Sequence, residues 1–200
     1  TWLMEKFKEL KNVDVYLIDQ LLKERIKPEM RILDAGCGSG RNFEIFLNNG
    51  YDITAIDSNS DAIFHLQNAY PNYSQKIKYT PIEDFKDLLK YDFVICNAVL
   101  HFAHNHQHFD QMFDNLISLL NSRGILFIRM TTDIGIQHLL PIPTLDHNGV
   151  YDLPDGTSRY LINREKINHL LEKYNLELLD PLKTVVVDKQ RSMATLVFQK

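Results

Sequence analysis

The sequence of 200 residues has little cysteine, no long apolar run and no cluster of basic residues. Two cysteines, Cys37 and Cys96, make no disulfide framework and are typical of a reducing compartment, so we expect a cytoplasmic location. No apolar stretch approaches the ~20 residues that span a bilayer, and no charged leader precedes an apolar run, so we expect neither a membrane partner nor a signal peptide. A net charge of −4 without a Lys/Arg run argues against a nucleic-acid partner.

The composition is that of a globular protein, with 44% hydrophobic and 24% charged residues. The length predicts one domain over 1–200, with an N-terminal helical segment at 1–27. Helical patterns alternate with short apolar runs, which indicates an α/β fold. Helices are expected at 14–26, around 43–47, from 59 or 60 to 70, at 106–121 and at 163–174. Strands are expected at 31–34, 52–56, 77–80, 93–96 and 125–130.

The last part of the chain differs from this alternation. The runs 176–187 and 193–198 are rich in β-forming residues and closely spaced, so they should pair as an antiparallel hairpin. The stretch 131–161 is rich in proline and glycine, with a tight turn expected around Asp155 and no other regular element. A loop of this length is usually a binding loop, so we expect 131–161 to form a lid over a substrate pocket.

Three glycines at alternate positions, Gly36, Gly38 and Gly40, lie between a predicted strand and a predicted helix. An ordinary turn needs fewer glycines, whereas bare backbone lets a ligand approach closely. A dinucleotide fingerprint would read G-x-G-x-x-G. The spacing G-x-G-x-G after Asp34, with Asp57 ending the second strand, resembles class I S-adenosylmethionine-dependent methyltransferases. The resemblance implies a doubly wound, Rossmann-like α/β sheet of seven strands, mostly parallel, with a C-terminal antiparallel hairpin.

The resemblance also implies a cofactor, S-adenosyl-L-methionine, with S-adenosyl-L-homocysteine as product. In the family, the acid at Asp34 anchors the amino acid end, and the acid at Asp57 accepts the ribose hydroxyls. Ile82 and Glu83 match positions beside the adenine, although short acidic runs also cap helices. The expected cofactor-binding residues are Asp34, Ala35, Gly36, Cys37, Gly38, Gly40, Asn42, Asp57, Ser58, Ile82, Glu83, Asn97 and Ala98.

His101 follows the fourth predicted strand, at the edge where open α/β sheets bind ligands. It is a candidate general base, with packing of the loop as the alternative. His104, His106 and His108 follow it without an acid at ligand spacing, so we expect no metal site. Arg159 and Tyr160 are candidate substrate residues that would grip an anionic or aromatic acceptor; a surface ion pair and simple packing are the alternatives.

The sequence therefore predicts an enzyme that transfers a methyl group to an O, N, S or similar nucleophile of a small-molecule acceptor. A tellurite-resistance-type methyltransferase is one specific form of this hypothesis. The alternatives are a non-catalytic S-adenosylmethionine-binding module and a nicotinamide-dependent oxidoreductase. The glycine spacing and the terminal hairpin count against the oxidoreductase.

Overall fold

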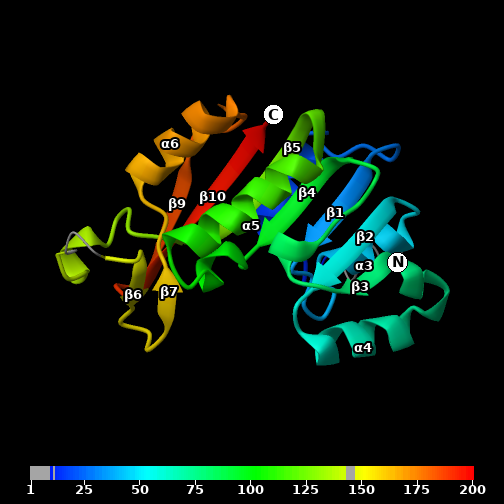
Figure 1. The fold of residues 1–200 in the computed structure, drawn as a ribbon, viewed down its shortest axis with the longest axis horizontal. Helices are drawn as coiled ribbons and strands as arrows, with labels where there is room; N and C mark the ends of the chain where they lie inside the picture. Colours follow the sequence, from blue (N-terminus) through cyan, green and yellow to red (C-terminus); the bar gives the residue numbers. More distant parts are fainter. Residues whose placement is uncertain (1–9, 11, 143–146) are drawn as a thin grey trace, which may run out of the picture.

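A computed structural model describes residues 10, 12–142 and 147–200, and its core is a single large sheet (Figure 1). Expectations for residues 1–9 and 11 fall outside the described residues. The strands of this sheet are β1 (Arg31–Ala35), β2 (Asp52–Asp57), β3 (Ile77–Tyr79), β4 (Tyr91–Asn97), β5 (Leu120–Thr132), β8 (Glu177–Leu178), β9 (Lys183–Val187) and β10 (Arg191–Gln199). Their order is β3-β2-β1-β4-β5-β10-β8, and β9 also pairs with β10.

The direction of the strands confirms the doubly wound α/β fold. The first five strands run parallel, and β10 is antiparallel to β5, β8 and β9. The predicted terminal hairpin is therefore present as β9 and β10. The sheet has eight strands rather than seven because β8 and β9, which both pair with β10, are separated at 179–182. Pro181 lies in this break and has no N–H to donate to a strand ladder.

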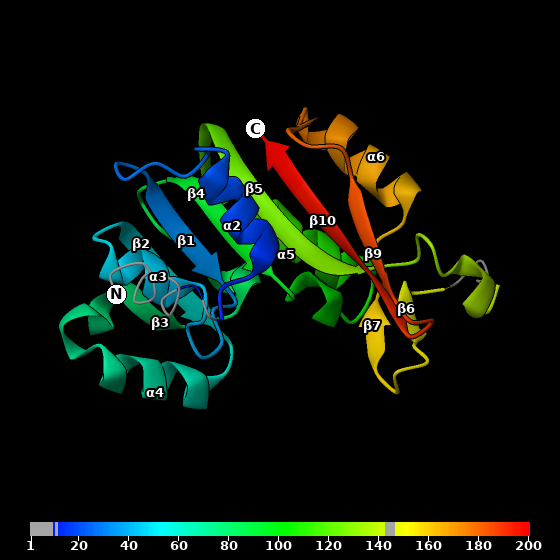
Figure 2. The same cartoon turned by 180° about the vertical axis from the view of Figure 1, so that it is seen from behind.

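Helices cover both faces of the sheet. They are α2 (Val15–Leu22), α3 (Phe43–Asn48), α4 (Ser60–Ala69), α5 (His106–Leu119) and α6 (Arg164–Tyr174). Figure 1 shows α5 and α6 on one face, and Figure 2 shows α2 on the other. Successive strand residues serve opposite faces: Leu33 packs in the cluster that contains α5 and α6 residues, and Ile32 packs with residues of α2, α3 and α4. None of the helices among the described residues is long and apolar enough to cross a membrane.

Helix α2 is shorter than the predicted 14–26. It begins after the N-cap Asp14, whose carboxylate accepts the Tyr16 amide at 2.9 Å. It ends before Glu24, which has a φ of 54°, a left-handed conformation that no α-helix contains. Arg25 then leaves the helix direction and donates to Asp180 at 2.6 Å, which ties this end of the chain to the break between β8 and β9.

The expectation that 131–161 lacks further regular structure is wrong. The segment contains a short 3₁₀ turn (Gln137–Leu139) and an antiparallel hairpin of β6 (Val150–Asp152) and β7 (Ser158–Tyr160). The predicted turn at Asp155 is confirmed, since the Asp155 carboxylate accepts from both the amide and the hydroxyl of Thr157 at 3.0 and 2.6 Å. This local pairing satisfies backbone groups that a featureless loop would leave to water.

Three apolar residues of this segment form a small core of their own. Ile136, Leu153 and Leu161 are buried together, apart from the two clusters beside the sheet. Ile142 lies outside this small core and is 93% exposed. Residues 143–146, including Leu145, fall outside the described residues.

The segment is closed at its base. The hydroxyl of Thr131 donates to the carbonyl of Tyr160 at 2.9 Å, and that of Thr132 donates to the carbonyl of Ile162 at 2.6 Å. A single parallel bridge also joins Thr132 and Ile162. We refer to these contacts as the base clasp.

Candidate functional site

The glycine loop after β1 is fixed against β2 and leaves bare backbone beside a pocket. The amides of Gly36 and Cys37 both donate to the carbonyl of Ile56, at 2.8 and 3.0 Å. Gly36 has a φ of 87°, and a Cβ there would lie 2.2 Å from a methyl of Val99. Gly38 has a φ of 52°, and a Cβ there would meet no atom of the described residues within 4 Å. Gly36 therefore serves close packing, whereas Gly38 faces open space.

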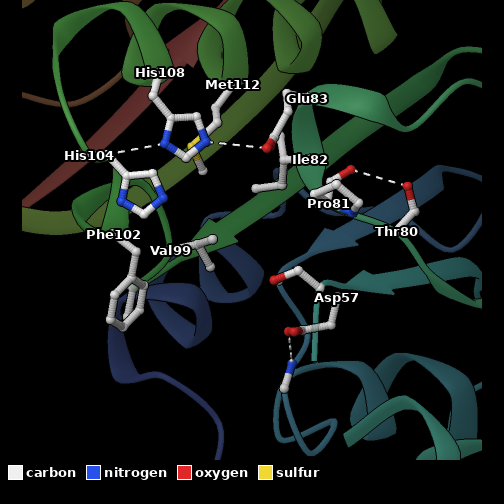
Figure 3. A pocket seen from close by; sticks show the side chains of 14 residues that line it. Asp57, Thr80, Pro81, Ile82, Glu83, Val99, Phe102, His104, His108 and Met112 are labelled. Carbon is white, nitrogen blue, oxygen red and sulfur yellow. Dashed lines mark hydrogen bonds and ion pairs between the residues drawn. The ribbon is translucent and has the colours of Figure 1, made fainter. Parts of the chain in front are cut away.

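The pocket beside this loop has a volume of about 460 Å³ and lies beyond the carboxyl ends of β1, β2 and β4 (Figure 3). Ligands of open α/β sheets bind at this edge. Its lining residues are Gly36, Gly38, Asp57, Ser58, Thr80, Pro81, Ile82, Glu83, Ala98, Val99, Phe102, His104, His108 and Met112. The structure thus brings together seven of the expected cofactor-binding residues: Gly36, Gly38, Asp57, Ser58, Ile82, Glu83 and Ala98.

Asp57 ends β2 with its carboxylate held in place at the pocket wall. One oxygen accepts the Gly38 amide at 2.7 Å, and the other accepts the Asn59 amide at 2.8 Å (Figure 3). A carboxylate oxygen has a second acceptor position. Asp57 can therefore accept two further hydrogen bonds from a diol without giving up its own anchors.

Asp34 lies buried in β1, immediately before the glycine loop, and is 1% exposed. Its Oδ2 has no hydrogen-bond partner among the described residues. Burial raises the pKa of Asp34 to about 7; nearby Asp57 adds to the rise, and Arg41 opposes it. A buried carboxylate without a partner is costly. An ammonium group placed beside Asp34 would remove that cost, so the residue fits the amino end of S-adenosylmethionine.

The far wall of the pocket is formed by an acid and two histidines. Glu83 belongs to a 3₁₀ turn (Ile82–Asp84), and its carboxylate lies 3.2 Å from Nε2 of His108. The backbone amide of His104 donates to Nδ1 of His108 at 3.2 Å, and the two rings stack at 4.7 Å. Over the described ranges, no group of three or more His, Cys, Asp and Glu is placed to hold a metal ion.

The remaining expected cofactor residues do not line this pocket. Asp34, Ala35, Cys37, Gly40, Asn42 and Asn97 are all buried. The Asn42 side chain instead accepts the amide of Asp14 at 3.1 Å. Burial raises the pKa of the thiols of Cys37 and Cys96, so both behave as small apolar residues rather than as a reactive pair.

Several residues of the pocket wall belong to no recognisable sequence motif. Val99 and Phe102 flank His101 in the turn after β4, and their position depends on the path of that turn. His108 and Met112 are four residues apart on α5, so they share one face of the helix. That spacing is the one signal by which the sequence marks this wall, and it equally fits core packing.

His101 belongs to a 3₁₀ turn (Leu100–Phe102), is 7% exposed, and faces a second cavity. This second cavity has a volume of about 240 Å³ and shares Ala98 with the first. Burial lowers the pKa of His101 to about 4, and the charges of Arg159 and Arg191 act in the same direction. The imidazole is therefore neutral near pH 7.

The two candidate substrate residues have different positions. Arg159 lines the second cavity, and its guanidinium lies 4.7 Å from the centre of the Phe102 ring. Tyr160 is 1% exposed, stacks on Phe109 at 4.8 Å, and places its hydroxyl 2.8 Å from Nδ1 of His106. Tyr160 thus has the packing role that the sequence left open as the alternative.

The fold is that of a class I S-adenosylmethionine-dependent methyltransferase. Its marks are the strand order with an antiparallel β10, the glycine loop, and the acids Asp34 and Asp57 at the ends of β1 and β2. A family profile described as a methyltransferase domain matches residues 10–180. The chain belongs to this family.

Individual relatives agree with this assignment. The chain is 30% identical over 158 residues to a ubiquinone biosynthesis O-methyltransferase of Rickettsia bellii, with 75% of this chain and 62% of that protein covered. The chain thus spans about three fifths of the length of that relative. A solved S-adenosylmethionine-dependent methyltransferase of Clostridium acetobutylicum has a TM-score of 0.69 at 16% identity, covering 94% of this chain and 91% of that one.

A second solved structure has the same fold with small molecules bound. It is the 1,6-didemethyltoxoflavin-N1-methyltransferase of Burkholderia thailandensis with bound 1,6-didemethyltoxoflavin and S-adenosylhomocysteine. Its TM-score is 0.62 at 17% identity, with 86% of this chain and 71% of that chain covered.

The two glycine environments lead to a first prediction. Gly38→Val should cost about 1–2 kcal/mol of stability for its positive φ and should strongly weaken binding of S-adenosylhomocysteine, because the new side chain enters the pocket. Gly36→Val should cost the same amount plus about 1–3 kcal/mol for overpacking against the rigid Val99. Urea unfolding and calorimetric titration measure the two effects. Equal stability of the two variants would contradict the assigned roles.

Proposed function

We propose that this chain is an S-adenosylmethionine-dependent methyltransferase acting on a small molecule. The observation that carries the proposal is the buried, unpartnered carboxylate of Asp34, one strand away from the anchored carboxylate of Asp57 at the same sheet edge. These two groups match the amino end and the ribose diol of one ligand. The relative's O-methyltransferase activity supports an oxygen nucleophile as the acceptor.

The residues present divide the binding work among them. Asp34 would pair with the ammonium group, Asp57 would accept the ribose hydroxyls, and the Gly38 backbone would lie against the ligand. Ile82 and Glu83 would lie beside the adenine. When bound, the cofactor supplies a methyl group on a positively charged sulfur, which is already a good leaving group. The protein must then mainly align the acceptor and exclude water.

We assign His101 the role of general base. Its ring is neutral near pH 7 and faces the second cavity, next to the Ala98 boundary with the first cavity. A neutral imidazole in that position can take the proton of an acceptor hydroxyl or amine as the new bond forms. Its Nδ1 has no hydrogen-bond partner in the described part of the chain, which favours this role over simple packing.

The lid hypothesis for 131–161 continues as part of the proposal, in a changed form. The hairpin β6–β7 contributes Val150 and Ser158 to a cavity that also contains His101. It contributes Arg159 to the second cavity. We propose that this hairpin, rather than the loop as a whole, covers the acceptor. We also place the protein in the cytoplasm, because its two cysteines are free and buried.

A ligand screen tests the proposed function. S-adenosylhomocysteine at about 100 times its Kd should add about 2.7 kcal/mol to the free energy of unfolding and raise the Tm, whereas NAD and NADP should leave the Tm unchanged. Stabilisation by NAD alone would favour the oxidoreductase alternative. Binding without transfer of labelled methyl groups into a metabolite extract or to tellurite would favour the non-catalytic module.

A further inference from the structure

We propose that the second cavity holds the methyl acceptor and selects a small organic anion, with a carboxylate or phosphate group bound at Arg159. This inference rests on the proposed function and specifies the acceptor class. The observations behind it are the charged residues around this cavity and the unpartnered polar atoms of two of its residues.

The second cavity is bordered by three arginines from separate elements. Arg129 comes from β5, Arg159 from β7 and Arg191 from the start of β10. Among the described residues, Asp155 is the one carboxylate that also lines the cavity. Three like charges around one small cavity repel each other unless an anion lies between them.

Two of these charges are already matched. Arg129 donates to Asp14 at 2.7 Å, and its guanidinium lies 4.8 Å from the centre of the Tyr16 ring. Arg191 donates to Asp155 at 3.0 Å. Both arginines are therefore held in place, and each has a carboxylate that offsets its charge.

Arg159 differs from the other two. Its hydrogen bond goes to its own neighbour, the carbonyl of Ser158, at 2.8 Å. It has no ion pair with any described carboxylate within 4 Å. Its guanidinium lies over the face of Phe102, which fixes its direction without neutralising it. Among the described residues, Arg159 is thus the one arginine of the cavity without a carboxylate partner, and an aromatic ring positions it.

Two residues that line this cavity have unpartnered polar atoms. The Nε of Arg129 and the Nδ1 of His101 are buried and have no hydrogen-bond partner within the described ranges. His101 is 7% exposed, so little bulk water reaches it. Buried polar groups of this kind are normally satisfied. An oxyanion at Arg159 would balance its charge, and a hydroxyl or amine of the same molecule would lie beside the imidazole of His101.

The size and position of the cavity restrict the acceptor further. Its volume of about 240 Å³ is below that of most sites for drug-sized ligands, which have about 300–1,000 Å³. Ala98 forms its boundary with the cofactor pocket. A small molecule can therefore have its anionic end at Arg159 and its nucleophile at the Ala98 end, where the methyl group would be delivered.

Benzoate and benzamide test this selection because they have the same shape and differ in charge. We expect calorimetric titration, with S-adenosylhomocysteine saturating, to give benzoate an affinity at least about tenfold higher than benzamide, as for one charge-assisted contact. Arg159→Met should remove this preference. Arg164→Met, which removes an exposed arginine on α6 away from the cavity, should keep it. Phenyl phosphate in a third titration shows which oxyanion is preferred.

The outcomes separate this inference from the proposed function. If S-adenosylhomocysteine binds, three results overturn the anion selection. They are equal affinity for benzoate and benzamide, no binding of benzoate, and a preference for benzoate that persists in Arg159→Met. Failure of S-adenosylhomocysteine to bind the wild-type protein would instead contradict the proposed function. Unchanged S-adenosylhomocysteine affinity in Arg159→Met shows that the variant is folded, and Arg159→Lys should recover part of the preference because it restores the charge.

Discussion

Asp57→Ala should lower the affinity for S-adenosylhomocysteine by at least about 100-fold, because it removes two charge-assisted hydrogen bonds worth about 1.5–3 kcal/mol each when well formed. The carboxylate is already oriented by the amides of Gly38 and Asn59. It therefore needs no reorganisation to accept a ribose diol. The same anchors mean that the variant also loses two contacts within its own loop.

Two measurements and a control variant separate the effect on binding from the effect on stability. Calorimetric titration gives the affinity, and urea unfolding gives the stability of the unliganded variant. Asp61→Ala is the matched control, since Asp61 is an exposed acid in the first turn of α4, and its affinity should equal that of the wild type. Unchanged affinity in Asp57→Ala would show that the ribose lies elsewhere.

The affinity for S-adenosylhomocysteine should also depend on pH through Asp34. The pKa of this carboxyl is raised to about 7 by burial, and the ammonium of the ligand pairs with the ionised form. Below pH 7, binding must displace a proton, so the affinity should fall by about tenfold per pH unit. Asp34→Asn has almost the same shape and does not titrate, so its affinity should be lower at pH 8 and nearly constant from pH 5 to 8.

The unliganded protein should show the opposite trend in stability. Because the folded-state pKa of Asp34 lies above its ordinary value of 3.8, the folded state binds this proton more tightly than the unfolded state. The contribution of Asp34 to stability is therefore full below pH 4 and is lost as pH rises through 7. Thermal melts of the wild type and Asp34→Asn from pH 4 to 8 isolate this contribution. A wild-type profile parallel to that of the variant would contradict the raised pKa.

The parts of the site that local sequence could predict are those next to strand ends. Asp34, Gly38 and Asp57 each lie at or just after a buried parallel strand, and such ends meet at one edge by the geometry of the fold. Hydrophobic runs likewise predicted the strands, because a doubly covered sheet leaves few polar positions in them.

The parts that sequence could not predict depend on contacts between distant segments. Tyr160 is a core residue because the hairpin turns it toward Phe109 on α5, and no local pattern encodes that direction. Asp180, in the break between β8 and β9, pairs with Arg25 from the other end of the chain, and no local pattern encodes that contact. Arg159 differs from Arg129 and Arg191 because those two have carboxylate partners from distant segments, and the sequence does not show which arginines are paired.

The base clasp between Thr132 and Ile162 also affects how the protein can diverge. The clasp holds the two ends of the segment together whatever residues lie between them. Each doubling of the length of a closed loop costs only about 0.6 kcal/mol of closure entropy. Part of the segment packs around its own small core, and Tyr160 near its end packs against α5. The length and sequence of this segment can therefore change while the sheet and the glycine loop stay intact.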